Sequence, residues 1–343
     1  SILVRVMGMI YRIPMTAIIG DKGNGFYSYA YSVYTILLLL SSYSLPLAVS
    51  KMVSAKAQLG QWRNVKRVFI CAIAFAIGIG TTFGLIVLIG AQFFTRVFFH
   101  SELAAIALRF MAPTILIMAL LGVFRGFFQG LQNTLPTAVS QIVEGLINAI
   151  MSVVFAYFLF DFGHGMDAAS GTTDLGYAWG AAGGAIGTGA GALAGLIFCF
   201  ILFVAYRKIL AVNISRDKTG TQQEYGDIFR LMLSIALPVI LSTALYNLIE
   251  LVDGSLFNNI MASKGMEDVK DSMWGAYNAK ALLLVHIPVS ISSAMAVSLV
   301  PTLTAAYALG DEQTAKSKVH AILRFISILA FPSAVGLLVL ANP

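Results

Sequence analysis

Long apolar stretches follow one another along almost the whole chain. A helix needs about 20 residues to cross a hydrocarbon core of about 30 Å, and nine stretches are long enough to do so. None shows the alternation of apolar and polar residues, over about ten positions, that a membrane-spanning strand requires. We therefore predict an all-α, polytopic membrane helix bundle. The nine predicted spans are residues 2–19, 26–49, 68–89, 103–124, 136–160, 179–206, 228–260, 274–303 and 321–340.

The composition supports a membrane protein without a catalytic centre. Apolar residues make up 58% of the 343 residues and charged residues only 11%, whereas soluble domains carry about 25% charged residues. Cys71 and Cys199 both fall inside apolar stretches and form no disulfide framework. No HExxH or GxSxG motif is present, so we expect neither an enzyme nor a metal or cofactor site. Because the chain starts at Ser1 rather than Met, we expect it to be a piece of a longer protein.

Cationic residues gather in alternate loops, whereas acidic residues dominate the intervening ones. Lys and Arg are enriched in loops on the cytoplasmic side of a membrane, so we place these loops and the amino terminus there. This distribution also accounts for the net charge of +6 without a nucleic-acid partner. The cations of these loops are Lys51, Lys56, Arg63, Lys66, Arg67, Arg207, Lys208, Arg216, Lys218, Lys316 and Lys318.

Two polar interruptions divide the chain. Residues 161–178 are rich in glycine and predict a flexible external loop, and residues 207–227 separate the sixth span from the seventh. We predict an amino-terminal six-helix lobe over residues 1–210, a cytoplasmic linker over 211–227 and part of a carboxy-terminal lobe over 228–343. The seven glycines of the sixth span favour close helix packing over a nucleotide-binding loop.

Two arginines on the first span are candidates for anion binding. Arg5 and Arg12 are seven residues apart, which places them on one side of a helix about 10 Å apart along its axis. Guanidinium groups bind phosphate oxygens bidentately, so this face suits a diphosphate. Alternatively, Arg5 reaches the cytoplasmic interface and Arg12 pairs with an acid. Lys280, near the start of the eighth span, is either a third cavity cation or a lysine at the outer interface.

Polar residues also share one face of the fifth span. Gln141, Glu144 and Asn148 follow one another at spacings of three and four, as residues lining a substrate cavity would. Glu144 could equally be a structural partner of Arg12 or Arg109.

The seventh span repeats this pattern with Asn247, Glu250 and Asp253. Paired carboxylates on one helix face can bind Na⁺ or take up protons, so these residues are candidates for ion coupling. The alternative is a salt bridge with Lys280.

Four motifs together resemble those of a known transporter family. They are RVMG at 5–8 followed by Arg12, SLPLAVSK at 44–51, FRGFFQG at 124–130 with Pro136-Thr137, and FPSAV at 331–335. This pattern resembles the polysaccharide flippase branch of the multidrug/oligosaccharidyl-lipid/polysaccharide exporter superfamily. Within that branch it is most similar to the stage V sporulation protein B and lipid II flippase group of Gram-positive bacteria.

The resemblance implies two six-helix lobes around a central cavity. Arg5 and Arg12 match the family's cavity arginines, Lys280 falls at or near an arginine of helix eight, and Asp253 matches an acid implicated in sodium binding. The chain departs from the Gram-negative lipid II flippases at 37–40, which are wholly apolar here where those proteins carry an arginine pair. Together with the lysine in place of an arginine, this leaves the identity of the cargo open.

Our hypothesis from the sequence is a monomeric flippase of the bacterial plasma membrane. It would move a polyprenyl-diphosphate-linked saccharide, lipid II or a related envelope precursor, to the outer leaflet by alternating access, among membrane lipids and with Na⁺ or H⁺ as the possible coupling ion. One alternative is a cation-coupled multidrug exporter of the same superfamily, whose cavity acids would bind organic cations. Another is a membrane-embedded glycosyltransferase or a scaffold that transports nothing.

Overall fold

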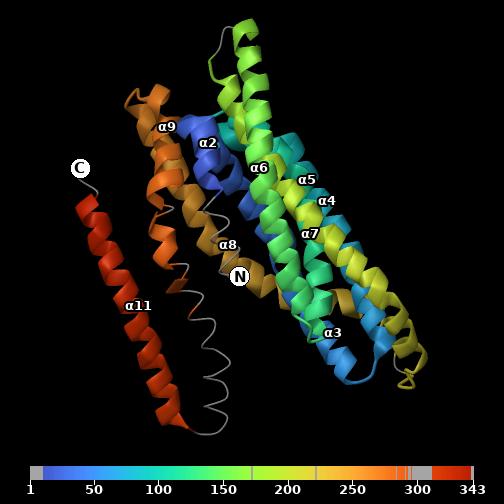
Figure 1. Cartoon of the computed structure of the whole chain (residues 1–343). Coiled ribbons are helices and arrows are strands. Elements are labelled where there is room, and N and C mark those ends of the chain that lie inside the picture. The colour runs from blue at the N-terminus through green and yellow to red at the C-terminus, as the bar shows by residue number, and fades with distance from the viewer. Residues whose placement is uncertain are drawn as a thin grey trace.

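The computed structural model describes residues 11–170, 173–220, 222–282, 284–289, 291, 292, 295 and 311–340. Over these ranges the chain is helical and contains no strand, which confirms the predicted all-α bundle. The helices run side by side, with α11 apart from the others at one edge (Figure 1). The elements are α2 (Arg12–Leu38), η1 (Leu39–Tyr43), α3 (Leu45–Gln58), α4 (Trp62–Phe99), α5 (Ala104–Gly130), α6 (Leu135–Ser170), α7 (Leu175–Ser215), α8 (Tyr225–Ser263), α9 (Glu267–Ala276), η2 (Tyr277–Ala281) and α11 (Glu312–Leu340).

Seven stretches of the described chain are long and apolar enough to cross a membrane, compared with the nine that were predicted. The difference has two sources. The described end of the first predicted span, from Arg12, and the whole of the second fall within one continuous stretch, Arg12–Gln58. Much of the predicted span at 274–303 lies outside the described residues.

The stretch Arg12–Leu38 is not one straight helix, because the chain folds back at Gly20. Its φ of 61° and ψ of −177° break the helix, and the positive φ favours glycine. In a straight helix Arg12 and Tyr31 would lie about 28 Å apart at 1.5 Å per residue, yet both line one small cavity. The described end of the first predicted helix, from Arg12, therefore meets the second predicted helix at a single-residue turn rather than a loop.

Several helices are longer than predicted. The glycine-rich segment at 161–178, predicted as a flexible loop, is instead largely helical, since α6 continues to Ser170 and α7 begins at Leu175. The Asp167 carboxylate accepts hydrogen bonds from the backbone N–H groups of Leu175 (2.8 Å) and Gly176 (3.2 Å). A carboxylate in this position satisfies N–H groups that the first turn of α7 leaves without helical partners, so it stabilises the tight connection.

The glycines of α7 allow its backbone to lie directly against α6. A Cβ atom built on Gly187 would overlap Ser152, and one on Gly191 would lie 2.6 Å from the Glu144 carbonyl oxygen. Small residues permit this approach between membrane helices, as the sequence predicted.

The connection between α7 and α8 is bound to the start of α4. Asp217 accepts a hydrogen bond from the Arg63 backbone N–H (2.9 Å), and the Arg67 guanidinium donates to the Gln223 carbonyl (2.6 Å). The guanidinium also lies 5.2 Å from the centroid of the Tyr225 ring, within range of a cation–π interaction. These contacts fix the point at which the chain enters α8.

At the other end of the bundle α2 and α9 are in close contact. A Cβ atom built on Gly275 would overlap the Asp21 backbone, and one on Gly25 would overlap the backbone of Asp271. Only glycine at these positions lets the two helices approach so closely.

Side chains reinforce this contact. The Tyr29 ring stacks on Phe99 of α4 (4.7 Å) and on Trp274 of α9 (6.2 Å), and its hydroxyl donates to Asn258 of α8 (3.0 Å). The buried Lys270 ammonium donates to the carbonyls of Phe99 (3.2 Å) and His100 (2.8 Å) at the end of α4, where a cation is favoured. We call this contact among α2, α4, α8 and α9 the outer closure, because the orientation predicted from the sequence places it on the outer side of the membrane.

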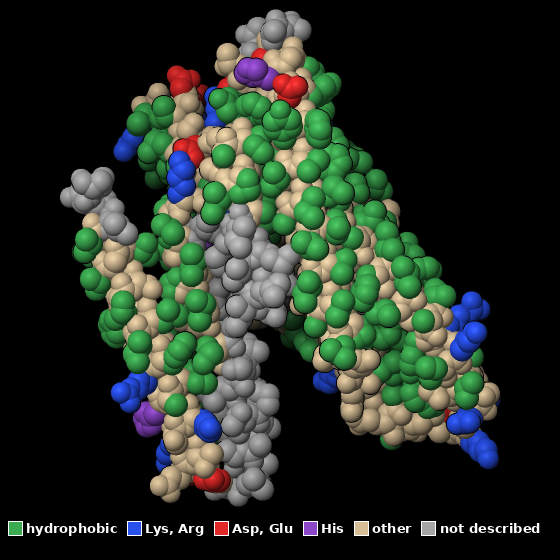
Figure 2. All heavy atoms as spheres, in the orientation of Figure 1, with side chains coloured by type: hydrophobic (Ala, Val, Ile, Leu, Met, Phe, Trp, Pro, Cys, Tyr) green, Lys and Arg blue, Asp and Glu red, His purple; other side chains and the backbone are tan. Residues whose placement is uncertain are grey.

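The surface matches a protein surrounded by lipid. Large apolar side chains cover the outside of the long helices in Figure 2, and Ile89 and Leu338 are 80% and 77% exposed. In the lower half of Figure 2 an open space separates the arm that carries α11 from the arm that carries α6 and α7. Lys and Arg side chains gather at the lower ends of both arms.

Candidate anion-binding cavity

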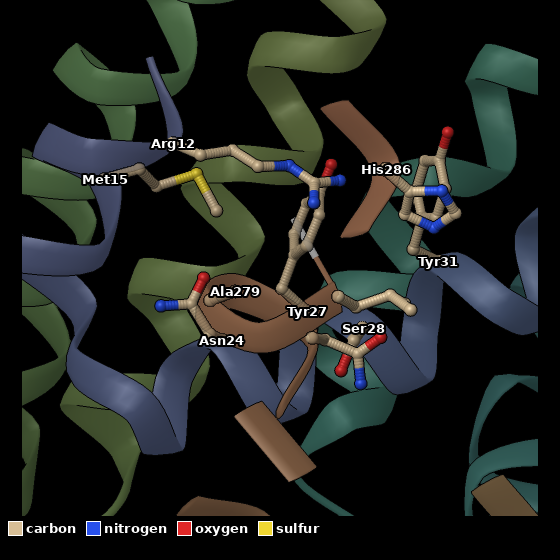
Figure 3. Close-up of a pocket in the computed structure, with 10 residues that line it drawn as sticks. Arg12, Met15, Asn24, Tyr27, Ser28, Tyr31, Ala279 and His286 are labelled. Atoms are coloured by element: carbon tan, nitrogen blue, oxygen red, sulfur yellow. The ribbon is translucent and has the colours of Figure 1, made fainter. Parts of the chain in front are cut away.

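A cavity of about 170 Å³ lies where the folded-back α2 meets η2 and the residues that follow it. Arg12 reaches into this cavity from the part of α2 that precedes Gly20, and its side chain lies over the ring of Tyr27 (Figure 3). The His286 side chain enters beside Tyr31. The lining consists of Arg12, Met15, Asn24, Tyr27, Ser28 and Tyr31 from α2, and Asn278, Ala279, Leu282 and His286 from the second half of the chain.

Arg12 is a partly buried cation without an acidic partner among the described residues. It lies eight residues before the turn at Gly20, or about 12 Å along the helix. The ion pairs of the described chain involve other residues throughout. A charge inside a membrane bundle costs a few kcal/mol or more unless water, protein or a ligand compensates it. The arrangement therefore favours binding of an anion in the cavity.

The other polar groups around Arg12 are held in place by the backbone. The side-chain amides of Asn24 and Asn278 donate to the carbonyls of Gly20 (2.8 Å) and Trp274 (3.0 Å), and the Ser28 hydroxyl donates to Gly25 (2.9 Å). These bonds fix the polar lining before any ligand arrives. A preorganised site loses less entropy when it binds.

A larger cavity of about 710 Å³ adjoins the first and shares Asn278, Leu282 and His286 with it. Asn247 and Asp253 line it from α8, together with the aromatic residues Phe257, Trp274 and Tyr277. The Asn247 amide donates to the Thr243 carbonyl (2.8 Å). The oxygens of Asn247 and Asp253 are ligands suited to Na⁺. No group of three or more His, Cys, Asp or Glu side chains that could bind a metal ion occurs in the part of the chain that the structure describes.

The structure places Lys280 apart from Arg12. Its ammonium pairs with the Asp21 carboxylate at 2.7 Å, beside the turn of α2, and the Lys280 side chain is 60% exposed. A second pair, Lys22 with Asp174 at 2.7 Å, lies next to it. Lys280 lines neither cavity in this conformation, and its proposed contact with a diphosphate stays a prediction.

The polar face of α6 is also separate from the cavity. Glu144 pairs with Arg125 of α5 at 2.6 Å, rather than with Arg12 or Arg109, and Asn148 accepts a hydrogen bond from Ser152 at 2.8 Å. Neither Gln141, Glu144 nor Asn148 lines the Arg12 cavity. Their role in substrate binding stays a prediction.

Two further predicted site residues cannot be placed. Arg5 lies outside the described residues, and so does the side chain of Glu250, although its backbone belongs to α8. Asp253 and Asn247, the other two predicted ion-coupling residues, lie together in the larger cavity.

Sequence reasoning missed most of the cavity lining. Four polar residues come after Gly20 at spacings of three, one and three from one another, which places them on one face of a helix. They are Asn24, Tyr27, Ser28 and Tyr31. That polar stripe within an apolar stretch was the signal available. His286 is one of four histidines scattered along the sequence, and no neighbouring motif marks it, because α2 supplies the residues near it in the cavity.

Comparison with known proteins places this architecture in a family. Residues 1–306 match the family described as polysaccharide biosynthesis protein. Two similar proteins of Bacillus subtilis (strain 168) carry functional names. Lipid II flippase MurJ is 26% identical over 99% of this chain and 62% of its own length. Stage V sporulation protein B is 24% identical over 100% of this chain and 63% of its own length.

A third relative of the same organism, the uncharacterized membrane protein YabM, is 23% identical over 100% of this chain and 61% of its own length. The chain thus spans about three-fifths of the length of these curated relatives. None of the solved structures matches it. The family match extends over most of the chain, and the structure supplies the apolar helices of a multi-pass membrane protein. The resemblance seen in the sequence motifs is therefore confirmed, and the chain belongs to the polysaccharide biosynthesis protein family.

Proposed function

We propose that the complete protein is a flippase for a polyprenyl-diphosphate-linked saccharide, lipid II or a related envelope precursor. The observation that carries the proposal is Arg12, whose guanidinium faces a cavity inside a membrane bundle without a carboxylate partner in the described chain. A diphosphate headgroup supplies the missing negative charge, and a guanidinium binds its oxygens bidentately. The similarity to a protein named as a lipid II flippase supports the same assignment.

The mechanism we propose is alternating access between two lobes. The space between the two arms opens at the end where Lys and Arg gather (Figure 2). The orientation predicted from the sequence makes this the cytoplasmic end and also places the amino terminus in the cytoplasm. The headgroup enters from that end and binds at Arg12 while the polyprenyl tail stays in lipid. Separation of α2 from α9 would then open the cavity outward. An empty cationic cavity is drawn back by the inside-negative potential, at about 2.3 kcal/mol per charge per 100 mV.

Other predicted residues take subsidiary roles in this proposal. Arg5 extends the cationic face toward the cytoplasm, and Lys280 becomes available to the headgroup once its pair with Asp21 opens. Asp253 and Asn247, with Glu250, are the candidates for binding a coupling Na⁺ or proton. The protein acts as a monomeric transporter in the bacterial plasma membrane and not as an enzyme.

A multidrug exporter is the second candidate function. One observation favours it: the larger cavity combines the Asp253 carboxylate with the aromatic rings of Phe257, Trp274 and Tyr277, a combination that binds organic cations. We place it second because the adjoining cavity contains Arg12, which repels a cation.

The test is translocation of a fluorescent polyprenyl-diphosphate saccharide by the complete protein in liposomes. We expect Arg12→Gln to abolish translocation at unchanged protein level. Arg109→Gln is the matched control, because Arg109 is exposed on α5 and lines neither cavity, and it should translocate as wild type does. Undiminished translocation by Arg12→Gln would refute the proposal. If the protein transports organic cations and does not translocate the lipid-linked saccharide, it is the multidrug exporter instead.

A further inference from the structure

His286 faces Arg12 across the cavity from the other half of the chain. Arg12 belongs to α2, whereas His286 follows η2 in the helical segment 284–289. Both side chains line the 170 Å³ cavity, and Figure 3 shows them entering it from different elements with Tyr27 between and below them. An anion held by both side chains would therefore connect the two halves of the chain.

The other polar side chains of the cavity already have interaction partners, and the Tyr27 hydroxyl lies 3.4 Å from that of Thr188. Ser28 donates its hydroxyl proton to Gly25, and Asn24 and Asn278 each direct an N–H to a backbone carbonyl. Arg12 has no carboxylate partner in the described chain, and none of the described hydrogen bonds or ion pairs involves His286. An imidazole carries one N–H when neutral and two when protonated, so either form donates to a phosphate oxygen.

We propose that His286 is the second phosphate-binding side chain of the cavity, and that the diphosphate of the lipid headgroup bridges Arg12 and His286. This inference rests on the proposed function and adds a residue that the family motifs do not include. It also gives the bound headgroup a structural effect, because a bridging anion draws α2 and the helix after η2 together. His286 also lines the larger cavity, which Asp253 of α8 lines too.

Equilibrium binding to the complete, purified protein tests the proposal, with a fluorescent polyprenyl diphosphate and the matching polyprenol as probes. A lost hydrogen bond to a charged group weakens binding about ten-fold, so we expect that loss for the diphosphate with His286→Leu, which removes both ring nitrogens and leaves no N–H donor in the side chain. Polyprenol binding should not change. His286→Lys retains a cation that binds phosphate and should restore affinity to within about three-fold of wild type. His320→Leu, which removes an exposed histidine of α11, is the matched control and should have no effect.

Inorganic pyrophosphate separates the two sources of a diphosphate group. Displacement of the lipid only by a large excess of pyrophosphate would support a headgroup site, whereas displacement at equal concentration would overturn the lipid assignment. If His286→Leu binds the diphosphate as tightly as wild type while Arg12→Gln does not, the inference about His286 is wrong and the proposed function stands. If both variants bind as wild type does, the proposed function fails as well.

Discussion

Arg125 and Glu144 form an ion pair that connects α5 to α6 inside the bundle. The Arg125 side chain is 11% exposed and that of Glu144 25%, and Arg125 also donates to the Ser140 hydroxyl at 2.9 Å. Arg125 belongs to the FRGFFQG motif, whose aromatic residues pack around Phe69 and Phe203. The motif thus has a structural role that its sequence did not reveal.

Breaking this pair should destabilise the protein more than removing both partners. A buried charge left without its partner costs about 3–5 kcal/mol, whereas an apolar replacement of both is often close to neutral. We expect Arg125→Met to lower the midpoint of thermal unfolding in detergent strongly, and the double variant Arg125→Met/Glu144→Met to recover part of the loss. If the double variant lowers the unfolding midpoint by the sum of the two single-variant decreases, the two side chains do not stabilise the protein through their interaction.

Asp217 provides a pH-dependent contact at the cytoplasmic end of the predicted topology. The hydrogen bond from the Arg63 backbone, followed by those from Thr219, lowers the pKa of Asp217 to about 2. A lowered pKa means that the contribution to stability is complete above the ordinary pKa near 4 and is lost as the pH falls from about 4 to 2.

Asp217→Asn should therefore unfold at a lower temperature than wild type at pH 6. The difference should narrow at pH 2.5, where the wild-type carboxylate is partly protonated. Thermal unfolding of both purified proteins at each pH measures this difference in unfolding temperature. A difference that stays constant with pH would show that ionisation of Asp217 does not stabilise the fold.

At the scale of single residues, the sequence indicated which charged residues lie inside the bundle better than it indicated the residues that they contact. Arg12 was expected to face either a phosphate or an acid, and no ion pair of the described chain includes it. For Glu144 the alternative to a place in the cavity was a pair with Arg12 or Arg109, and it pairs with Arg125 instead. Such pairings depend on how distant helices are oriented about their axes, which spacing along one helix does not determine.

At the scale of elements, the outer closure depends on two glycines. Gly275 lies against the backbone of Asp21, and Gly25 against that of Asp271. No side chain fits at these positions unless α2 and α9 move apart. The closure is therefore a contact between backbones, and the ion pair of Lys280 with Asp21 lies beside it.

Gly275→Val should open this closure. The added side chain would force α2 away from α9, so a cysteine at position 24, introduced into a cysteine-free background, should react faster with a membrane-impermeant maleimide added from outside. Gly78→Val is the control, since nothing lies within 4 Å of a Cβ atom built there. Equal labelling rates in the two variants would mean that the α2–α9 contact does not restrict access to the cavity.

The apolar pattern predicted which segments are helical, but not where the helices end or bend. Residues 161–170 looked like loop because they are polar and rich in glycine, yet α6 continues through them and Asp167 then binds the start of α7. Hydropathy detects burial in lipid, and helices that extend past the bilayer lose that signal. The break at Gly20 was expected as a short loop, and only its backbone angles show how tight the turn is.

At the scale of the whole molecule, the described structure is closed at one end and hollow at the other. The closed end is held by the backbone contact of α2 with α9 and by Lys270 at the end of α4. The Arg12 cavity lies beneath this closure. The division into a lobe at 1–210 and a partial lobe at 228–343 stays a prediction, although the connection between them is bound to α4 rather than free.

The central claim is that a phosphorylated lipid headgroup binds at Arg12. The most direct measurement is an electron cryo-microscopy structure of the complete protein with polyprenyl diphosphate bound. We predict density for the phosphates in the cavity lined by Arg12 and Tyr27, with phosphate oxygens about 2.7–2.9 Å from the guanidinium nitrogens. A structure in which the diphosphate lies elsewhere, with the Arg12 guanidinium paired to a carboxylate, would contradict the account.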